Sequence, residues 1–448
     1  MKLADQKERY VFLETFGCQM NDNDSERILG YLAAINYRAT SDPERADLIL
    51  LNTCSIREKA EHKVYSALGR YRALKERRPG TILGVGGCVG QQQGSRLLKR
   101  LGYLDIVFGT GSIHRLPELI NNISNHRGQQ EATELTNTLD PDEFAVAPYR
   151  NSPVKAFVTI MRGCNNFCSY CIVPYVRGRE VSRSAADILD EVRTLAASGV
   201  KEVALIGQNV NSYGNGGEIS FPTLMEMVCE IDGIERLRFT TSHPKDLSKK
   251  LIELIADEDK VCGHLHLPVQ SGSNAVLEKM GRGYRREEYL AKIDLLRGLS
   301  PQIAITTDII VGFPGETEAD FNDTVTLLET VEYDNIFSFK YSPRPMTKAI
   351  RLDGEIEDDV KRVRLARVQQ LQSQITLKKN RALIGRKIEV LVEGRAKVGD
   401  GCMTGRTPCN RVVNFTGSED LVGKVIAMTV QDGSLNSLKG VAAEAVRC

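Results

Sequence analysis

The chain has 448 residues, of which 42% are hydrophobic and 26% are charged, and its formal net charge is +1. This length predicts two to four domains, and this composition is ordinary for a soluble globular protein. Because the net charge is close to zero, only local clusters of charge can indicate a binding partner.

The sequence carries no signal for a membrane or for secretion. No stretch approaches the roughly 18 consecutive apolar residues of a membrane span. The N-terminus, MKLADQKERY, is polar and lacks the apolar core of a signal peptide. We therefore expect a cytoplasmic protein with no membrane partner. Eleven cysteines in a reducing compartment indicate metal binding or redox chemistry rather than a disulfide framework.

Residues 10–140, which follow a polar tail at 1–9, alternate strand-like and helix-like patterns. Helical patterns follow four apolar strand patterns, which are YVFLETFGC, ADLILLNTC, TILGVGGC and YLDIVFGTG. The first of these helices, in NDNDSERILGYLAAIN, is expected to be capped by its Asn and Asp residues. This alternation predicts a doubly wound parallel sheet. The stretch 141–153 breaks the periodicity with Pro and Asp and is expected to be a linker.

Cys18, Cys54 and Cys88 each lie at the C-terminal end of a predicted strand. They are 36 and 34 residues apart, which is about one strand–helix–strand unit in each case. Because the carboxyl ends of neighbouring parallel strands converge where ligands bind, we expect the three thiols to meet at one edge of the sheet. The alternative is that they are small buried hydrophobic residues. Their recurrence at three strand ends favours a ligand site.

Residues 154–375 contain six further strand patterns, with helical patterns at 184–198, 221–230, 246–256, 286–298 and 317–331. Six units are too few for a closed eight-fold barrel, so the pattern predicts an open, partial (β/α)6 barrel with its chemistry at the C-terminal strand ends. The polar residues at those ends are Gln208, Asn209, Ser242, His243, Gln270, Ser271, Asp308 and Ser342.

A basic stretch begins before the C-terminal segment, 376–446, and overlaps its first part. Residues 361–397 contain eleven Lys or Arg and two Glu. Short β-like runs with Gly-rich turns follow and predict a small β-barrel. The charge excess indicates a surface for a phosphate backbone, although a solvated helix face is the alternative. The candidate RNA-binding residues are Lys378, Lys379, Arg381, Arg386, Lys387, Arg406, Arg411 and, for stacking on bases, Phe415.

Cys164, Cys168 and Cys171 form a C-x3-C-x2-C motif after the first strand of the partial barrel. A disulfide uses two thiols and a closed zinc site uses four ligands. The next Cys and His along the chain, Cys229 and His243, do not complete a zinc pattern. Three thiolates suit a [4Fe–4S] cluster that keeps one iron open for an exogenous ligand.

At these residues the sequence resembles the radical S-adenosylmethionine superfamily, whose signature has this spacing and an aromatic residue, here Tyr170, before the last Cys. The motifs GVGGCVGQ, GQNVNSYG, HLPVQSGSNAVLEKMGRGY and TDIIVGFPGET are similar to the methylthiotransferase family. GRTPCNRVVNF resembles the family's RNA-binding TRAM barrel. NTCSIREKAE and CIVPYVRGREVSR resemble the branch that acts on isopentenyladenosine in tRNA, and residues 55–57 differ from the patterns of the ribosomal-protein and threonylcarbamoyladenosine branches.

The resemblance implies a methylthiotransferase N-terminal domain at 10–140, a radical S-adenosylmethionine core at 154–375 and a TRAM domain at 376–446. It implies one [4Fe–4S] cluster that binds S-adenosylmethionine on Cys164, Cys168 and Cys171. It implies an auxiliary [4Fe–4S] cluster, which carries the sulfur, on Cys18, Cys54 and Cys88. No catalytic residue is assigned beyond these ligands. Candidate contacts to S-adenosylmethionine are Tyr170, Gln208, Ser242, Gln270, Asp308 and Gly312, for which turn and strand-end capping is the alternative.

The implied reaction consumes two S-adenosylmethionines, one as methyl donor and one as radical source. A radical would abstract hydrogen from C2 of isopentenyladenosine on the 3' side of the anticodon, and a methylthio group would replace it. The implied partners are the tRNA anticodon stem-loop, an electron donor such as flavodoxin or ferredoxin, and a donor that rebuilds the sulfur, with the chain acting as a monomer. The alternatives are a ribosomal-protein or threonylcarbamoyladenosine methylthiotransferase and a non-enzymatic iron–sulfur RNA-binding protein.

One residue departs from the family pattern in a way that concerns the backbone. Met346, in YSPRPMTKA, stands where the family usually has Gly. A Gly would permit a positive φ or a close approach at this position.

Overall fold

The computed structural model describes residues 8–55, 58–125, 128–136, 138–150, 152–397 and 401–442, without the side chains of 58–62 and 141. Most of the expected tail at 1–9, and residues 56 and 57 of the branch-specific motif, lie outside the described residues. No helix in the described part of the chain combines the length and apolarity that a membrane crossing would need.

The chain forms two compact units that do not coincide with a simple cut of the sequence. The first contains Met1–Asn151 together with Met161–Asn165 and Cys171–Arg183. The second contains Ser152–Ile160, Asn166–Tyr170 and Ser184–Cys448. The C-x3-C-x2-C loop is therefore divided, because Cys164 and Cys171 belong to the first unit and Cys168 to the second.

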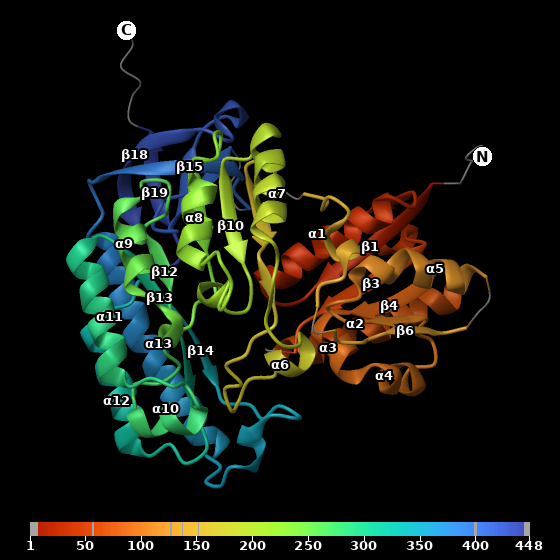
Figure 1. Cartoon of the computed structure of the whole chain (residues 1–448), viewed down its shortest axis with the longest axis horizontal. Helices are drawn as coiled ribbons and strands as arrows, with labels where there is room; N and C mark the ends of the chain where they lie inside the picture. Colours follow the sequence, from red (N-terminus) through yellow and green to blue (C-terminus); the bar gives the residue numbers. More distant parts are fainter. Residues whose placement is uncertain are drawn as a thin grey trace. The chain divides into compact units, whose positions relative to one another are not determined.

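The first unit is built on a six-stranded parallel sheet with the strand order β2-β1-β3-β4-β5-β6 (Figure 1). The four predicted strands are β1 (Arg9–Thr15), β3 (Leu48–Thr53), β4 (Ile82–Gly86) and β5 (Ile106–Phe108). Two short edge strands, β2 (Tyr37–Ala39) and β6 (Gln130–Ala132), were not predicted. The helices are α1 (Gln19–Ala33), α2 (Glu58–Arg77), α3 (Gly87–Gln93), α4 (Ser95–Arg100) and α5 (Leu116–Ser124).

Both faces of this sheet are buried, as the doubly wound prediction requires. Along β3, Leu48 and Leu50 belong to one apolar core, which includes residues of α1 and α5. Ile49 and Leu51 alternate with them and belong to a second core, which includes residues of α2 and α4. Because side chains on a strand alternate between faces, a continuous apolar run supplies both cores.

The segments around the cysteine loop that join the first unit are short. They are β8 (Met161–Arg162), β9 (Val181–Ser182), which pairs with β8 in an antiparallel ladder, and the helix α6 (Val173–Val176). A 3-10 helix, η3 (Pro141–Phe144), occupies the start of the expected linker and also belongs to this unit.

The second unit contains the predicted partial barrel. Its six parallel strands form two sheets of three, β11-β10-β7 and β12-β13-β14, with a single parallel bridge from Leu237 in β11 to Val261 before β12. The strands are β7 (Lys155–Thr159), β10 (Glu202–Ile206), β11 (Arg236–Phe239), β12 (His264–His266), β13 (Ala304–Val311) and β14 (Asn335–Lys340). The helices are α7 (Ala185–Ala197), α8 (Phe221–Cys229), α9 (Lys249–Asp257), α10 (Asn274–Met280), α11 (Arg286–Leu299) and α12 (Glu318–Val331).

A long helix, α13 (Asp358–Arg381), follows the last strand and leads into a closed five-stranded barrel. Its strands are β15 (Lys387–Arg395), β16 (Cys402–Arg406), β17 (Val412–Thr416), β18 (Val425–Gly433) and β19 (Leu438–Ala442). The predicted small β-barrel is therefore present, and its core includes Val390, Met403, Val413 and Phe415. The basic helix is not simply solvated, because Lys361 and Arg364 of α13 are buried.

Candidate functional site

The fold places Cys18, Cys54 and Cys88 after three adjacent strands of the first unit. Cys54 directly follows β3, Cys18 is three residues beyond β1, and Cys88 lies at the start of α3 after β4. The strand order β1-β3-β4 brings these positions to one edge of the sheet, as the sequence predicted. We refer to them below as the auxiliary thiols.

The first helix begins differently from the prediction. Cys18 itself is the N-cap of α1, and its side chain makes no capping hydrogen bond. The Asn and Asp residues expected to cap the helix lie inside it, and Asn21, Asn23 and Asp24 are buried. Asn21 donates to the carbonyl of Thr53 at 2.9 Å, so the helix start is tied to the residue before Cys54.

Two glycines allow the backbone to approach the auxiliary thiols closely. Gly17 has a φ of 140°, and a Cβ there would lie 2.7 Å from the Cβ of Cys54. Gly87 has a φ of 83°, and a Cβ there would lie 2.4 Å from the carbonyl oxygen of Thr53. Both contacts are closer than real Cβ atoms tolerate, so these glycines are needed for the local packing.

The auxiliary thiols share a buried cation. Arg177 donates to Asp24 across 2.7 Å, and the two side chains are only 5% and 2% exposed. A hydrogen bond with Cys54 lowers the pKa of the Cys18 thiol to about 6, burial opposes this shift, and the charge of Arg177 adds to the lowering. Burial raises the pKa of Cys88, and Arg177 again acts in the lowering direction. The guanidinium therefore favours thiolates at this edge of the sheet.

Three thiols are a donor set that fits an iron–sulfur cluster with one open iron. Within the described residues, no group of three or more His, Cys, Asp or Glu side chains is arranged to hold a metal ion. A cubane cluster takes a separate thiolate on each iron. Three thiols, a nearby cation and close backbone approaches suit such an anionic cluster.

The flanks of the C-x3-C-x2-C loop run side by side in the first unit. The backbone N–H of Cys164 donates to the carbonyl of Gly178 at 3.3 Å. The N–H of Glu180 donates to the side chain of Asn165 at 3.2 Å. After Cys171, Ile172 and Val176 pack against Cys88. The chain that leaves the loop therefore contacts one of the auxiliary thiols directly.

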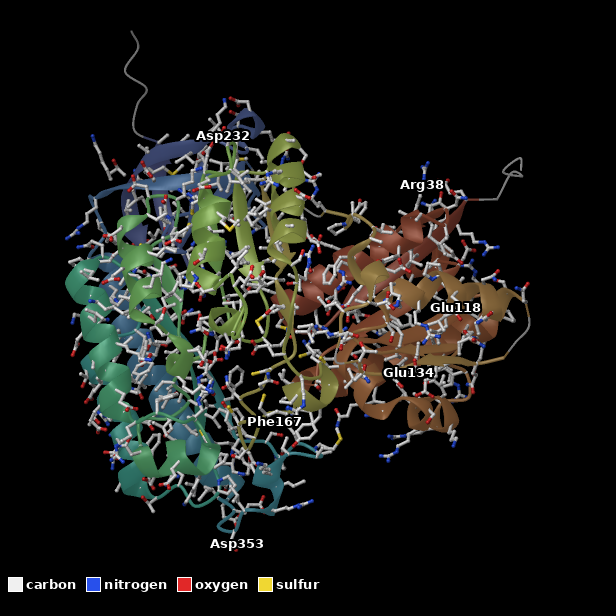
Figure 2. The ribbon with its side chains drawn as sticks, viewed as in Figure 1. Arg38, Glu118, Glu134, Phe167, Asp232 and Asp353 are labelled. Atoms are coloured by element: carbon white, nitrogen blue, oxygen red, sulfur yellow. The ribbon has the colours of Figure 1, made fainter. Side chains whose placement is uncertain are left out.

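The middle of the loop is held in the second unit. Phe167, labelled in Figure 2, has a φ of 45°, which few non-glycine residues adopt. Ser169 donates its backbone N–H to Met280 and its hydroxyl to Lys279, each at 2.8 Å. Arg282 donates to the Sγ of Cys168 at 3.4 Å. These contacts fix Cys168 relative to the C-terminal end of α10.

The strand ends of β10 and β11 contain buried polar atoms that have no hydrogen-bond partner among the described residues. They include Asn209 Oδ1, Ser242 Oγ and His243 Nε2. His243 accepts the backbone N–H of Lys245 on Nδ1 at 3.2 Å, so the ring proton of the neutral imidazole is on Nε2. Burial, with help from nearby Arg282, lowers the pKa of His243 to about 2, so the ring is neutral.

Such atoms are expected where a polar ligand binds, because an unpaired buried polar atom is costly. The backbone supports this interpretation. Thr241, just before Ser242, has a φ of 69°, which is a strained conformation for a β-branched residue and is typical of functional sites. Ser242 was predicted as a cofactor contact, whereas His243 was only noted among the strand-end residues. Sequence reasoning missed its orphaned donor because no pattern distinguishes one buried His from another.

The other candidate cofactor contacts also lie in the second unit, and Asp308 is inside β13 rather than at its end. Gln270 is buried and has a φ of 74°. Asp308 lies 3.6 Å from His266. The ring of Tyr170 packs edge to face on Phe313 with centroids 6.4 Å apart. Gln208 is buried less deeply than Ser242, at the end of β10.

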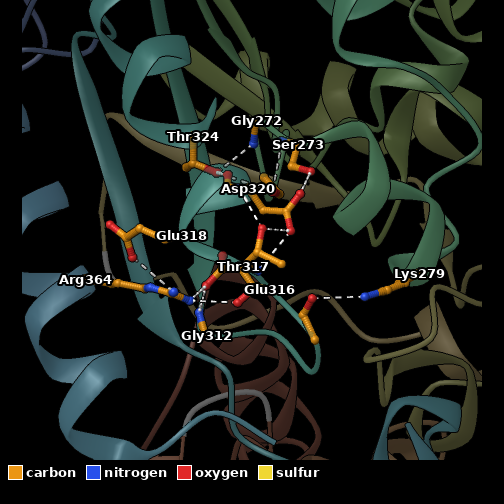
Figure 3. A network of polar contacts seen from close by, with 12 residues as sticks. Gly272, Ser273, Lys279, Gly312, Glu316, Thr317, Glu318, Asp320, Thr324 and Arg364 are labelled. Carbon is orange, nitrogen blue, oxygen red and sulfur yellow. Dashed lines mark hydrogen bonds and ion pairs between the residues drawn. The ribbon is translucent and has the colours of Figure 1, made fainter. Parts of the chain in front are cut away.

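Gly312 is held in a rigid turn, which Figure 3 shows. Its N–H donates to Glu316 at 2.6 Å, and Arg364 from α13 pairs with the same carboxylate at 2.7 Å. Lys279 donates to the carbonyl of Gly315 at 3.0 Å (Figure 3). The long helix α13 and the helix α10 therefore both fix the turn that follows β13.

Four of the eight candidate RNA-binding residues are engaged inside the protein. Arg411 pairs with Asp334, and Lys379 donates to the same carboxylate at 2.8 Å. Arg406 pairs with Glu393 at 3.1 Å. The prediction that Phe415 stacks on RNA is wrong, because its ring lies in the barrel core and is 3% exposed.

The remaining four candidates are exposed. Lys378 pairs with Glu332 at the surface. The other three form no ion pair within the described residues, and they are Arg381 at the end of α13 and Arg386 and Lys387 at the start of β15. They leave positive charge available on the surface between α13 and the small barrel.

The small barrel is attached to the partial barrel by arginines from β11. Arg236 donates to the carbonyl of Arg406 at 2.7 Å. Arg238 donates to the carbonyls of Thr407 and Pro408, each at 2.7 Å. Lys155 pairs with Glu393 at 3.0 Å. Sequence reasoning missed this attachment, since the arginines donate to backbone carbonyls and the Lys155–Glu393 pair joins residues far apart in the chain.

Three family models match separate parts of the chain. The Radical SAM superfamily matches residues 158–328, the Uncharacterized protein family UPF0004 matches residues 10–109, and the TRAM domain matches residues 381–443.

Comparison with known proteins gives long matches at high identity. The chain is 54% identical to the tRNA-2-methylthio-N(6)-dimethylallyladenosine synthase of Geotalea uraniireducens, over 97% of this chain and 99% of that protein. It is 51% identical to the protein of the same name from Geobacter sulfurreducens, over 96% and 97% of the two chains. Among solved structures, the radical S-adenosylmethionine methyltransferase TsrM of Kitasatospora setae aligns with a TM-score of 0.56 at 15% identity, over 89% of this chain and 77% of that one. The last likeness shows a shared fold.

Proposed function

The chain belongs to the tRNA-2-methylthio-N(6)-dimethylallyladenosine synthase family, and from this premise we propose that it is a tRNA methylthiotransferase. It inserts a methylthio group at C2 of N6-isopentenyladenosine on the 3' side of the anticodon. It uses two [4Fe–4S] clusters and two S-adenosylmethionines for each insertion. The observation that carries the proposal is the pair of three-cysteine sets, one at the sheet edge of the first unit and one in the divided loop.

Each set leaves one iron of a cubane without a protein thiolate. When bound, the cluster on Cys164, Cys168 and Cys171 supplies radical chemistry with S-adenosylmethionine, and the cluster on the auxiliary thiols supplies the sulfur. An aromatic C–H bond is out of reach of ordinary acid–base catalysis, so the cofactors must provide the reactivity.

The chain's own residues bind and orient the reactants. The Nε2–H of His243 is a fixed, neutral donor, and Ser242 adds a second polar atom beside it. We assign both to acceptor oxygens of S-adenosylmethionine. Because the strand ends are buried, they also exclude water from the reacting groups.

The anticodon stem-loop is bound through its phosphates by the exposed basic residues Arg381, Arg386 and Lys387. Their charge is not neutralised by carboxylates in the described part of the chain, unlike that of Arg411 or Lys379. Binding of this kind weakens steeply as salt is raised. We place the domain boundaries at 10–140, 154–375 and 376–446, and expect a cytoplasmic monomer that receives electrons from flavodoxin or ferredoxin.

The experiment that tests the function is a comparison of tRNA from cells with and without the gene. Digests from cells without it should lose 2-methylthio-isopentenyladenosine and accumulate isopentenyladenosine. If the methylthio nucleoside persists while a ribosomal protein or a threonylcarbamoyladenosine loses its methylthio group, the substrate assignment is wrong. If the reduced, iron-loaded protein never cleaves S-adenosylmethionine, the protein is a non-enzymatic iron–sulfur RNA-binding protein.

The two-cluster claim has a separate test in the iron content. Protein reconstituted without oxygen should contain about eight Fe, which is two cubanes by the ligand count. Replacing Cys18, Cys54 and Cys88 together by Ala should leave about four Fe. A parent protein that holds only about four Fe would contradict the claim.

A further inference from the structure

Arg282 is a buried cation that connects several parts of the second unit. Its Nη1 donates to the Sγ of Cys168 and to the hydroxyl of Tyr170, each at 3.4 Å. Its Nε donates to the hydroxyl of Tyr284 at 3.1 Å, and its Nη2 donates to the carbonyl of Pro268 at 2.6 Å. The residue is only 4% exposed, so these contacts replace water almost completely.

The charge of Arg282 is not balanced by a carboxylate within the described residues. Other buried arginines have such a partner, since Arg177 pairs with Asp24 and Arg162 pairs with Glu143 at 2.9 Å. Arg282 instead faces a thiol and two phenols. A buried cation without a counter-charge is expensive, so its surroundings require an anion.

The sulfur of Cys168 is the neighbour of Arg282 that can supply this negative charge, because a cysteine that ligates an iron–sulfur cluster does so as a thiolate. The adjacent His243 is neutral, and Lys245, which donates to Asn166 of the loop at 2.6 Å, is itself paired with Asp246 at 3.8 Å. A cluster held by thiolates supplies the counter-charge that Arg282 lacks in the protein itself. The hydrogen bond from a charged donor to a thiolate is also stronger than one between neutral groups.

We propose that Arg282 is a positioning residue for the [4Fe–4S] cluster on the C-x3-C-x2-C loop, where it fixes the Cys168 thiolate and makes the cluster easier to reduce. The inference rests on the proposed function in taking Cys168 as a cluster ligand. One electron from reduced flavodoxin, or from dithionite in the test tube, enters the cluster, and the donor is oxidised by one electron. The fixed positive charge stabilises the added negative charge.

The test uses the full chain with Cys18, Cys54 and Cys88 replaced by Ala, so that only one cluster forms. In this background, Arg282→Gln removes the charge and Arg282→Lys keeps it. Arg285→Gln is the matched control, because Arg285 is three residues away and its side chain is 71% exposed. The readout is the reduction potential of the cluster, measured by a redox titration followed by electron paramagnetic resonance.

We expect Arg282→Gln to lower the ratio of reduced to oxidised cluster about tenfold at a fixed potential, which is about 59 mV for one electron. Arg282→Lys and Arg285→Gln should stay close to the parent. An unchanged potential in Arg282→Gln with about four Fe bound would overturn the proposal. A Lys variant that shifts as far as the Gln variant would also overturn it, because the charge would then not be the cause.

A second measurement distinguishes positioning from a purely structural role. The metal-free Arg282→Gln protein should unfold at a temperature close to that of the metal-free parent, since the loss of hydrogen bonds is offset by the removal of a buried charge that has no counter-charge there. If Arg282→Gln cannot hold iron but keeps this unfolding temperature, the positioning role is supported. If its metal-free form is strongly destabilised, Arg282 is a structural residue and the proposal fails. If the parent cleaves S-adenosylmethionine and only the Arg282 results fail, the proposed function stands.

Discussion

Replacing Asp24 by Asn should destabilise the first unit far more than removing a carboxylate from its surface. Asp24 and Arg177 are 2.7 Å apart with side chains 2% and 5% exposed, and Arg27 lies 3.9 Å from the same carboxylate. The substitution leaves both guanidinium groups without this charge. Breaking a buried pair on one side costs about 3–5 kcal/mol, which is roughly three powers of ten in the folding equilibrium.

The assay is urea unfolding of the metal-free protein with a reporter confined to the first unit. The chain has no Trp, so Tyr149→Trp, at a position that is 49% exposed, provides a single fluorescent probe there. Glu76→Gln is the control, because Glu76 and Arg72 form a pair at 2.9 Å whose side chains are 63% and 59% exposed. Removing such a pair costs at most about 1 kcal/mol.

A double variant tests the same buried ion pair. Asp24→Asn combined with Arg177→Met removes both charges of the central pair, so it should recover much of the lost stability. A cost for Asp24→Asn no larger than that of Glu76→Gln would refute the claim that this pair is the electrostatic centre of the site. The claim would also be refuted if the loss of stability in the double variant equalled the sum of the losses in the two single variants.

Three further predictions concern the second unit. Met346 has a φ of 69° and is 52% exposed, so Met346→Gly should stabilise the unit by about 1 kcal/mol in urea unfolding, and a loss of stability would contradict this. His243 has its pKa lowered to about 2, so it binds a proton only in the unfolded state below about pH 6.5. Stability should therefore fall as the pH drops below that value, by up to about 1.4 kcal/mol per pH unit, and His243→Asn should flatten this part of the profile. Replacing the exposed basic residues Arg381, Arg386 and Lys387 by Ala should weaken tRNA binding in a filter assay and reduce the salt dependence of that binding. An unchanged salt slope would exclude the three residues from the interface.

Most of the fold could be predicted from the periodicity of apolar residues, because buried helices and strands repeat their apolar positions at a fixed spacing. In β3, successive side chains face two different cores in turn, so the first four residues of LILLNT are apolar on both sides. Such a run is readily identified as a buried strand. The edge strands β2 and β6 were missed since they have three residues each and few apolar side chains. The five helices predicted for the partial barrel lie within a few residues of α7, α8, α9, α11 and α12, whereas the short helix α10 was not predicted.

The division of the cysteine loop could not be predicted, because it depends on contacts between residues far apart in the chain. Arg177 follows the loop closely in sequence, yet its partner Asp24 is 153 residues away. Sequence continuity assigned the whole of 154–375 to one domain for this reason. A buried Arg is indistinguishable from an exposed one until its partner is known.

The same limit explains the errors at the RNA surface. A count of Lys and Arg in 361–397 does not reveal that Asp334, 45 residues before Lys379, neutralises that ammonium group. Phe415 alternates with polar neighbours in β17, and the closed barrel turns it inward.

The most direct test of the central claim is a single reaction carried out without oxygen. The iron-loaded protein is mixed with S-adenosylmethionine, a reductant and an anticodon stem-loop whose isopentenyladenosine carries deuterium at C2, and the digested nucleosides are analysed by mass spectrometry. We predict that the nucleoside gains one methylthio group in place of the deuterium and that the deuterium is recovered in 5'-deoxyadenosine. Cleavage of S-adenosylmethionine that leaves both the nucleoside and its deuterium unchanged would contradict the account.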